Sequence, residues 1–400
     1  MENRFTKDEL ASRANVDLEL VERLLSLGII VPSDGPAPFG PGDVYRIRLA
    51  LACDRAGMHP ESLAKAIDEG KLSLGFMDLP HYRWTLVGTK TYAELAAELD
   101  VDLEFVFDVV QAEGLPRPTP GDRIREDDQL VFQLLRLTRS IIDGETLVRT
   151  VRVYVESLRK IADAEATLFA SRIVPAFEAQ GISRVEAVNL ANRFGAEATA
   201  MQEQAILSLY RRLQERRWNE VVIEGIEEVL EEMGLYERPL RPPAFSFVDL
   251  AGYTRLTEEH GDEAVARVAA GMSGVVDRVA ARHGGQAVKW LGDGVMLYFR
   301  DPSRAVSATI EIVREAPRVG LPAHAGVAAG PVVVQDGDYF GRTVNMAARI
   351  GSFAKAGQTL VTGDAAGLSA DAGVTFRSLG PVDLKGFARP VPVFEATVAS

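Results

Sequence analysis

The sequence FSFVDLAGYT (residues 245–254) decides the fold of the last two fifths of this 400-residue chain. An apolar run that is typical of a buried strand ends at Asp249, and the chain then turns through Gly252. The sequence KWLGDGV (residues 289–295) repeats this arrangement around Asp293. If neighbouring strands bring the two carboxylates side by side, they form the oxygen-rich site that hard divalent cations such as Mg²⁺ prefer.

Each aspartate alone also fits a simpler interpretation, because Asp near Gly is common in turns and helix caps. A third motif, DYFGRTVNMAAR (residues 338–349), favours the functional interpretation. It predicts a turn that enters a helix, on which Asn345 and Arg349 share one face because they are four residues apart. An arginine beside an amide is suited to stabilising charge on a phosphoryl group.

The three motifs, in this order and spacing, resemble the catalytic domain of the class III nucleotide cyclases, the adenylyl and guanylyl cyclase family. The resemblance covers residues from about 242 to 400. It implies an α+β domain of the ferredoxin-like type, with helices packed on a mostly antiparallel sheet. We expect strands at residues 244–250, 285–290, 294–299, 322–329 and near 331–335, and helices at residues 262–282, 302–315 and 343–353. It also implies two Mg²⁺ or Mn²⁺ ions per active site, bound by Asp249, Asp293 and the backbone carbonyl of Leu250.

The resemblance implies that Asn345 orients the ribose and that Arg349 stabilises the transition state. It implies that Lys289 and Asp338 read the purine and that Lys385, in VDLKGF, contacts the terminal phosphates. An ammonium can donate to adenine N1 and a carboxylate can accept from the 6-amino group, whereas guanine reverses this edge, so the pair predicts ATP. Backbone amides at the predicted helix start would cradle the β- and γ-phosphates. These amides run from Ala251 through Gly252, Tyr253 and Thr254.

The expected reaction is therefore conversion of ATP to 3′,5′-cyclic AMP and pyrophosphate. The ribose 3′-hydroxyl attacks the α-phosphorus in line, assisted by two metal ions. Domains of this family act as head-to-tail pairs, with the metal aspartates on one chain and the transition-state residues on the other. Because this chain carries both sets, we expect a homodimer with two composite sites. One departure is the uncharged sequence VVVQ (residues 332–335), where some relatives have a basic residue.

Composition is that of a globular protein with two or three domains, with 47% hydrophobic and 25% charged residues. No apolar run approaches the ~18 residues that a membrane span needs, and the N-terminus lacks a secretory hydrophobic core. The single cysteine, Cys53, excludes an internal disulfide framework and suits a cytoplasmic protein. Residues 241–400 contain 16 basic and 16 acidic residues, so the net charge of −13 falls entirely in residues 1–240.

An internal repeat lies at about residues 5–50 and 90–135, where ELA followed by VDLE recurs before Gly and later Pro-Gly-Asp. Each unit predicts two helices joined by a tight turn and then a longer helix. This order resembles a helix-turn-helix, with a weak likeness to the winged version of MerR-type regulators. The second helix of each unit is acidic, which opposes contact with a polyanion, so we expect a structural scaffold and no nucleic-acid partner.

Residues 127–235 predict long helices, with Ser183 as an N-cap. The last helix carries an apolar stripe that fits either a core or a dimer seam. The stripe comprises Val221, Val222, Gly225, Ile226, Val229, Leu230 and Met233. Gly234 and a proline-rich connector then end the helix. We expect three parts: a helical domain (1–218), a linker (219–241) and the catalytic domain (242–400).

The N-terminal region is expected to regulate the catalytic domain by changing how two copies meet. The whole chain resembles actinobacterial-type soluble cyclases with an all-helical N-terminal regulatory domain, some of which respond to pH or lipids. His81, near Trp84, is the best candidate proton sensor, and a lipid or another small-molecule effector is equally open. Two rival functions are an ATP-binding pseudo-enzyme, which the complete residue set opposes, and a transcription factor with a nucleotide sensor, which the acidic helices oppose.

Overall fold

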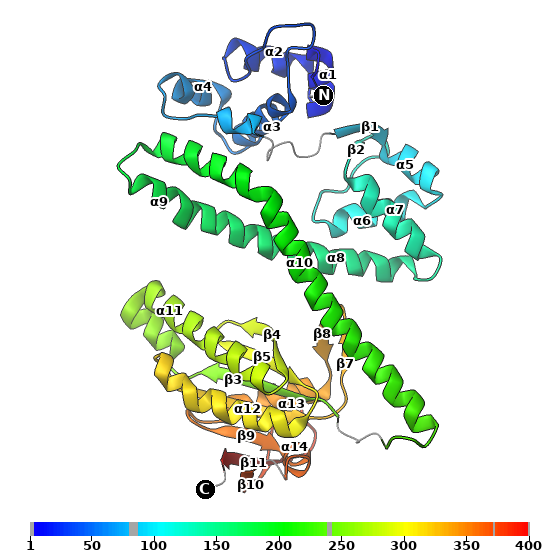
Figure 1. Cartoon of the computed structure of the whole chain (residues 1–400), viewed down its shortest axis with the longest axis vertical. Coiled ribbons are helices and arrows are strands. Elements are labelled where there is room, and N and C mark those ends of the chain that lie inside the picture. Colours follow the sequence, from blue (N-terminus) through cyan, green and yellow to red (C-terminus); the bar gives the residue numbers. More distant parts are fainter. Residues whose placement is uncertain (1–3, 80–86, 238–241, 371–372, 399–400) are drawn as a thin grey trace. The chain divides into compact units, whose positions relative to one another are not determined.

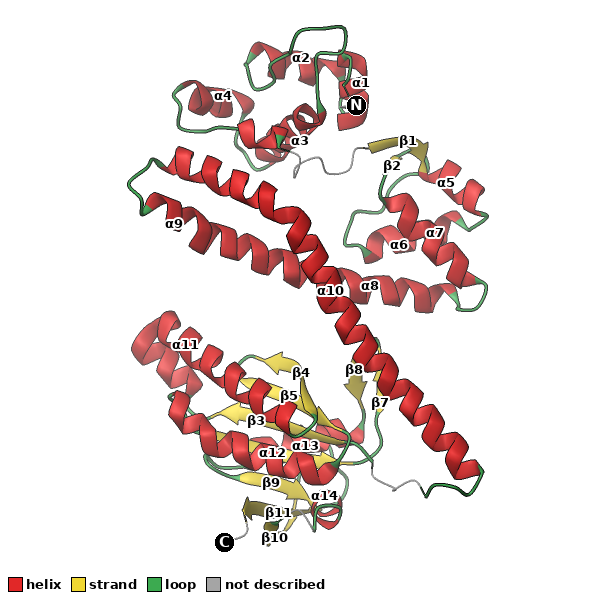
Figure 2. Cartoon of the chain, in the orientation of Figure 1, coloured by secondary structure: helices red, strands yellow, loops and turns green. Residues whose placement is uncertain are grey.

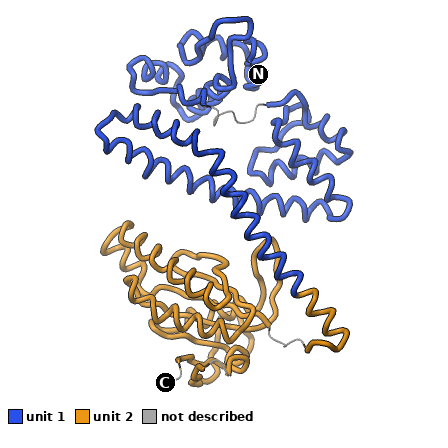
Figure 3. The backbone as a smooth tube through the Cα atoms, viewed as in Figure 1, with its two compact units in different colours: residues 1–223 blue, residues 224–400 orange. Residues whose placement is uncertain are grey.

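The computed structural model describes residues 4–79, 87–237, 242–370 and 373–398. It divides into two compact units, residues 1–223 and 224–400 (Figure 3). His81 and most of the proline-rich connector lie outside the described residues. No helix in the described ranges combines the length and the apolar character that crossing a bilayer requires.

The second unit is built on a seven-stranded sheet in the order β10-β11-β9-β6-β3-β5-β4. All neighbouring strands are antiparallel except β6 and β9, which are parallel. The β3-α11-β4-β5-α12-β6 portion has the strand order β6-β3-β5-β4, which is the ferredoxin-like arrangement that was predicted. The strands are β3 (Ala244–Leu250), β4 (Gly285–Leu291), β5 (Gly294–Phe299), β6 (Ala323–Ala329), β9 (Thr359–Thr362), β10 (Val374–Val382) and β11 (Val391–Val398).

Helices pack against the sheet of the second unit, whose strands are yellow in Figure 2, and alternating side chains give this sheet two faces. Ala244, Val248 and Leu250 of β3 join a large core with α11 (Tyr253–Arg282) and α12 (Pro302–Glu315). The opposite face carries Phe245 and packs against α13 (Arg342–Phe353). Because strand side chains alternate with a period of two, Asp249 lies on the α13 face. The site residues of β3 and α13 therefore share one side of the sheet.

Helix α13 lies directly against β6 at a contact between two glycines. A Cβ atom on Gly326 would lie 2.2 Å from the backbone nitrogen of Gly351 and 2.3 Å from the carbonyl oxygen of Ala347. Any larger residue at position 326 would push the helix away from the sheet. This contact fixes the distance of α13 from the strand that neighbours Asp249.

A small hairpin of β7 (Val333–Gln335) and β8 (Asp338–Phe340) is held to the sheet by aromatic rings. Tyr339 stacks on Tyr298 of β5 with ring centroids 5.0 Å apart, and its centroid lies 5.1 Å from that of Phe245. Aromatic pairs at such distances add stabilisation beyond simple burial. The cluster positions Asp338, the residue before Tyr339. The unit also contains the short elements η4 (Ala316–Val319) and α14 (Gly363–Gly367).

The first unit contains the two predicted helical repeats (Figure 1). Thr6 and Glu9 form a capping box at the start of one repeat, and Thr91 and Glu94 form the same box in the other. The internal turns also match, because Asn15 and Asp100 both adopt the left-handed conformation. The first repeat contains α1 (Lys7–Ala14), α2 (Leu18–Ser26), α3 (Pro41–Arg55), α4 (Pro60–Asp68) and η1 (Gly75–Asp78). The second contains β1 (Val87–Thr91), α5 (Tyr92–Leu99), α6 (Leu103–Ala112), β2 (Arg123–Arg125), α7 (Asp128–Arg139) and α8 (Gly144–Leu168).

Two differences from the predicted repeats are visible. The second repeat carries a two-stranded ribbon, β1 with β2, which the expectation of an all-helical region did not include. The Pro-Gly-Asp motif also has a different role in each copy. A Cβ atom on Gly42 would lie 2.4 Å from Asp78 Oδ1, whereas one on Gly121 would meet nothing within 4 Å.

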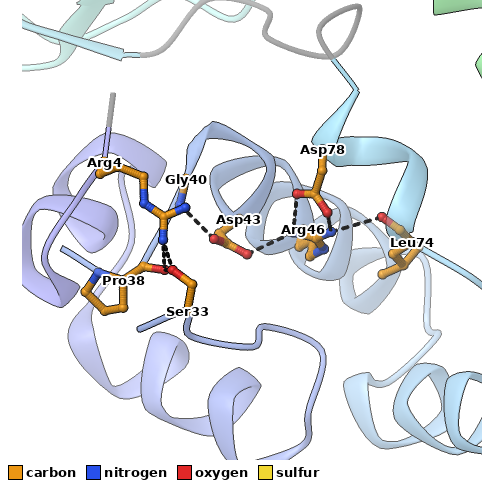
Figure 4. Close-up of polar contacts among 8 residues, drawn as sticks. All are labelled: Arg4, Ser33, Pro38, Gly40, Asp43, Arg46, Leu74 and Asp78. Carbon is orange, nitrogen blue, oxygen red and sulfur yellow. Dashed lines mark hydrogen bonds and ion pairs between the residues drawn. The ribbon is translucent and has the colours of Figure 1, made fainter. Parts of the chain in front are cut away.

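Arg46 explains why α3 and η1 pack so closely in the first repeat (Figure 4). Its guanidinium donates to Asp43 Oδ1 and to Asp78 Oδ1, both at 2.9 Å, and to the carbonyl oxygen of Leu74 at 3.3 Å. Burial raises the pKa of Asp43, whereas the hydrogen bond from the Gly40 amide and the charge of Arg46 lower it. Arg46 is thus paired with two carboxylates, of which Asp43 is buried with it, so the network does not offer an open anion site.

Long helices complete the first unit and continue beyond it: a π-helical turn η3 (Phe169–Ile173), α9 (Val174–Glu178) and the 49-residue α10 (Arg184–Glu232). Ser183 caps α10 as predicted, since its hydroxyl accepts from the Glu186 amide. In the part of the chain that the structure describes, much of the apolar stripe near the end of α10 is open to solvent, since Val222, Ile226 and Val229 are each more than half exposed. The dimer seam therefore stays a prediction.

Candidate active site

Asp249 lies near the end of β3, between residues of two neighbouring strands. Its Cα partners are Gly294 on β5 and His324 on β6. A Cβ atom on Gly294 would lie 2.8 Å from Asp249 Oδ1, so glycine at this position leaves room for the carboxylate itself. Asp293 precedes Gly294 in the tight β4–β5 turn, where Gly292 takes a positive φ of 68°. The hairpin therefore brings the two predicted metal ligands to the same end of the sheet.

The electrostatics of this pair fit a cation. Burial raises the pKa of Asp249, and the charge of Asp293 raises it further, whereas His324 and the Leu250 amide lower it. Two acidic groups that oppose each other's ionisation are stabilised by a divalent ion between them. No three His, Cys, Asp or Glu side chains gather as a possible metal site anywhere in the described ranges. An ion here would take its remaining ligands from backbone carbonyls, water or substrate.

His324 is a site neighbour that the sequence analysis did not identify. Its Nδ1 lies 2.9 Å from the carbonyl oxygen of Gly351, at the end of α13. Its Nε2 lies 3.7 Å from Asp249 Oδ2, and the imidazole is only 16% exposed. The predicted antiparallel strands 244–250 and 322–329 could have indicated this contact, but only with their register known.

Asn345 and Arg349 lie on the exposed face of α13, as their spacing predicts. The opposite face, with Val344, Ala347 and Ile350, is buried against the sheet. Arg349 makes no hydrogen bond or ion pair within the described part of the chain, so its guanidinium is available for a phosphate. The structure thus presents both side chains to solvent from a firmly packed helix.

Lys289 and Asp338, the predicted purine-reading residues, already contact each other. Lys289 Nζ donates to Asp338 Oδ2 at 2.8 Å, across 49 positions of sequence. Burial would raise the pKa of Asp338, but hydrogen bonds from Lys289 and from the Tyr339 amide outweigh it and keep the pKa below its ordinary value. The structure brings this predicted pair together as a charged donor and a charged acceptor.

Lys385 projects from a turn that is fixed on both sides. Leu384 is buried, Gly386 takes a φ of 90°, and the Phe387 amide donates to the Leu384 carbonyl at 3.0 Å. The guanidinium of Arg342, the first residue of α13, lies 4.8 Å from the centre of the Phe387 ring. This cation–π contact connects the Lys385 turn to the helix that carries Asn345 and Arg349.

The predicted phosphate cradle needs one correction. Helix α11 begins at Tyr253 after Gly252, whose φ is 87°, so a helix start lies where it was expected. However, the amide of Ala251 donates to the carbonyl oxygen of Pro322 at 2.8 Å and is not free to bind phosphate. The amides of Gly252, Tyr253 and Thr254 remain as candidates.

The adenylate and guanylate cyclase catalytic domain family matches residues 236–394. The C-terminal unit is a class III nucleotide cyclase domain. The match includes every candidate site residue considered above. It leaves the whole helical first unit, residues 1–223, outside the family.

Curated relatives of this cyclase domain occur in actinobacteria. An uncharacterised protein of Mycobacterium tuberculosis is 35% identical over 37% of this chain, and the match covers only 39% of that relative's length. A protein named pH-sensitive adenylate cyclase, also of M. tuberculosis, is 28% identical over 75% of this chain and 76% of its own length. An adenylate cyclase of Streptomyces coelicolor is 39% identical over 30% of this chain and 32% of its own length.

Among solved structures, the adenylyl cyclase CyaB of P. aeruginosa is similar to this chain. The similarity covers 40% of this chain and 95% of that one, at 26% identity and a TM-score of 0.37.

Proposed function

We propose that this chain is an adenylate cyclase that converts ATP to 3′,5′-cyclic AMP and pyrophosphate. The observation that carries the proposal is the pair Asp249 and Asp293 at one end of the sheet of a cyclase domain. The Lys289–Asp338 contact supports ATP over GTP, because the two groups complement the N1 and 6-amino positions of adenine. Several curated relatives are named adenylate cyclases.

The metal site would be formed by Asp249 and Asp293, with the carbonyl of Leu250. The donor set is rich in oxygen, and burial, together with the charge of Asp293, raises the pKa of Asp249, an effect that a bound cation would oppose. Two bound Mg²⁺ or Mn²⁺ ions would supply Lewis-acid activation of the 3′-hydroxyl and charge neutralisation of the leaving pyrophosphate. This number and choice of ions belong to the proposal.

The remaining residues orient the substrate and stabilise charge. Asn345 would hold the ribose, and Arg349 would donate to the α-phosphate as negative charge develops there. An arginine in this role is worth roughly 10³–10⁵ in rate in other phosphoryl-transfer enzymes. Lys385 and the amides of Gly252, Tyr253 and Thr254 would hold the terminal phosphates.

The first test is direct. Purified full-length protein is incubated with ATP or GTP and with Mn²⁺ or Mg²⁺, and cyclic nucleotide is quantified. We expect cyclic AMP from the wild type and none from Asp249→Ala. Cyclic GMP as the main product would contradict the base assignment. Absence of any product, from both the full chain and residues 242–400, would contradict the enzymatic function.

The composite homodimer is part of the same proposal. If each site takes its aspartates from one chain and Arg349 from the other, Asp249→Ala and Arg349→Ala should each be inactive alone. Mixed in equal amounts and allowed to exchange subunits, they should recover about one quarter of wild-type activity, because half of the dimers then hold one intact site of two. Failure to recover activity, with subunit exchange confirmed by labelling, would exclude sites shared between chains.

We further propose that residues 1–218 regulate the cyclase domain (242–400) through the linker (219–241). The similarity to a pH-sensitive adenylate cyclase extends beyond the catalytic domain, over 75% of the chain. Within the second unit, Glu227 of α10 pairs with Arg300 at the end of β5, so the linker helix contacts the catalytic sheet. A proton, a lipid or another small molecule could be the effector.

Regulation is tested by removing residues 1–241. The specific activity of the fragment, measured across pH 5.5–8.5 and across protein concentration, should differ from that of the full chain. Identical profiles would exclude regulation by the helical region. Vesicles of anionic lipid, added to both forms, distinguish a lipid effector from a proton.

A further inference from the structure

Helix α13 presents a third polar residue on the face that carries Asn345 and Arg349. Arg342, the first residue of the helix, precedes Asn345 by three positions and Arg349 by seven, and this spacing places the three side chains on one face. All three are exposed, whereas Val344 and Ala347 between them are buried against the sheet. The proposed function gives a role to Asn345 and Arg349, and Arg342 extends their row to the start of the helix.

The guanidinium of Arg342 is held over an aromatic ring. Its central carbon lies 4.8 Å from the centre of the Phe387 ring. Phe387 in turn packs against a buried cluster that includes Ile350 of α13 and Leu384 of the turn that carries Lys385. A guanidinium over a ring is attracted through its charge, and its five N–H donors stay available for other groups. The contact therefore orders the side chain without using its hydrogen bonds.

The donors of Arg342 have no acceptor on the protein. Within the described residues Arg342 makes no hydrogen bond and no ion pair, and the same is true of Lys385, two positions before Phe387. Asp383, the acidic residue nearest to Lys385 in sequence, is exposed and forms no ion pair with either cation in that part of the chain. Two cations that meet at one aromatic ring without a carboxylate partner form a region of positive charge that attracts an anion.

The terminal phosphates of ATP are an anion that fits this region. They carry several negative charges, and the proposed function provides one side-chain cation for them, Lys385. The sequence between Arg318 and Arg349 contains no Lys or Arg other than Arg342, and its segment 332–335 is uncharged. A guanidinium can donate two parallel hydrogen bonds to a phosphate, whereas the ammonium of lysine acts as a point charge. Arg342 therefore adds a kind of contact that Lys385 does not make.

We propose that Arg342 is a substrate-binding residue that donates, together with Lys385, to the terminal phosphates of ATP. The inference rests on the proposed function for the identity of the nucleotide, and it adds a residue to which that function gives no role. Because Arg342 would contact neither the base nor the ribose, it should strengthen binding of the triphosphate without affecting the choice of base.

The test is direct binding of a nucleotide that cannot cyclise. 3′-Deoxy-ATP and 3′-deoxy-AMP, each with Mg²⁺, are titrated into the full-length protein, and the ratio of their dissociation constants measures the contribution of the terminal phosphates. Arg342→Met keeps much of the length of the side chain and removes its charge. We expect it to weaken binding of 3′-deoxy-ATP about 10-fold and to leave binding of 3′-deoxy-AMP unchanged. Equal weakening of both nucleotides, or of neither, would overturn the proposal.

A double substitution separates direct contact from positioning of the Lys385 turn. If Arg342 only held that turn in place, its replacement would cost nothing further in protein that already lacks the Lys385 ammonium. If Arg342 itself donates to phosphate, Arg342→Met should weaken 3′-deoxy-ATP binding in the Lys385→Met background as well. No further loss in the double variant would therefore overturn direct binding by Arg342.

The matched control is Arg377→Met, which makes the same change at an exposed arginine that pairs with Glu395 outside the site. Its affinities for 3′-deoxy-ATP and 3′-deoxy-AMP should equal those of the wild type. A loss in this variant as large as that in Arg342→Met would show that the effect follows from overall charge, and would contradict a specific contact.

Activity separates this inference from the proposed function. Cyclic AMP production by the wild type and by Arg342→Met, with the same KM for ATP and the same affinity for 3′-deoxy-ATP, would leave the proposed function standing and exclude Arg342 as a phosphate ligand. Weaker 3′-deoxy-ATP binding in Arg342→Met, with no cyclic nucleotide from the wild type under any condition, would support the binding role and contradict the enzyme.

Discussion

At the scale of single residues, the proposed metal ligand Asp249 lowers the stability of the metal-free fold. Asp249 is partly buried beside Asp293, and both conditions raise its pKa. An acidic group whose pKa is raised by folding destabilises the folded state wherever it is ionised. Sites organised for function commonly lower stability in this way.

Asp249→Asn should therefore stabilise the metal-free protein while abolishing activity. At pH 7, in the presence of a metal chelator, we expect the free energy of unfolding of the variant to exceed that of the wild type by less than about 1 kcal/mol. The difference is small because the half-exposed carboxyl is screened by water. The gain should be lost below about pH 4, where the aspartate is protonated in the folded and unfolded states alike. Thermal unfolding across pH measures this, and added Mn²⁺ should reverse the order by stabilising only the wild type.

In the proposed function, Lys289 contributes a charged hydrogen bond to base recognition. Lys289→Met keeps the length of the side chain and removes its charge, so we expect kcat/KM for ATP to fall about 10–100-fold, corresponding to a bond of about 1.5–3 kcal/mol. The value for GTP should fall much less, since guanine offers no matching acceptor. Arg377→Met, which removes an exposed cation paired with Glu395 outside the site, is the control. Equal losses for both nucleotides would contradict base reading by Lys289.

At the scale of elements, the contact between β6 and α13 determines where Asn345 and Arg349 lie. The helix approaches the strand through Gly326 and Gly351, and His324 also donates to the last turn of α13. Little space therefore remains for α13 to shift relative to β6. The position of the α13 face that carries Asn345 and Arg349 therefore depends on residues outside the proposed substrate contacts.

Gly326→Ala should displace α13. The added methyl group would meet backbone atoms at 2.2 and 2.3 Å, so we expect about 1–3 kcal/mol of destabilisation and a lower kcat from a misplaced Arg349. Gly274→Ala is the matched control, because a Cβ there meets nothing within 4 Å and alanine favours the helix. Urea unfolding and steady-state kinetics measure the two effects. Unchanged stability in Gly326→Ala would show that α13 can move freely.

Local sequence patterns predicted the elements whose boundaries depend on local chemistry. The strands at 244–250 and 294–299 and the helix at 302–315 agree with the structure to the residue. The helix predicted from 262 begins at Tyr253 instead, because Gly261 interrupts it with a φ of 74° and an earlier helical segment precedes the glycine. Strands β10 and β11 were not predicted. They pair with each other at one end of the sheet, and Gly380 and Pro381 interrupt the pattern.

The residues of the candidate site also divide into those that local sequence patterns predict and those that depend on non-local contacts. Motif spacing was enough to place Asp249, Asp293, Asn345 and Arg349. His324 required a cross-strand register, and the loss of the Ala251 amide depends on a contact with Pro322 that no local pattern shows. These contacts are non-local, so they follow from the assembled sheet and not from the residues near them in sequence.

At the scale of the whole molecule, the acidic first unit contains a carboxyl group that titrates near neutral pH. Burial raises the pKa of Glu113 from 4.5 to about 7, aided by Asp128 and Asp127 and opposed by Arg125. Glu113 caps the end of α6, and Asp128 begins α7. The ionised group destabilises the fold, so stability falls as pH rises from about 4.5 through about 7.

Glu113→Gln should remove this part of the pH dependence. At pH 8 we expect the variant to be roughly 1 kcal/mol more stable than wild type after allowance for screening, and near pH 4.5 the two should be equal. Glu94 is a control of opposite sign, because its capping bonds with Thr91 lower its pKa, so Glu94→Gln should destabilise the protein above pH 5. Parallel stability curves for wild type and Glu113→Gln would contradict the raised pKa.

Because α10 is one uninterrupted helix, residues inserted into it rotate the part of the chain that follows about the helix axis, in equal steps. Its 49 residues extend roughly 73 Å, and each inserted residue turns everything after it by about 100°. Alanines inserted between Glu215 and Arg216 should therefore alter effector-dependent activity periodically. Two residues should abolish the response, and seven, which complete about two turns, should restore it. A response that simply declines with insert length would show that α10 transmits no rotation.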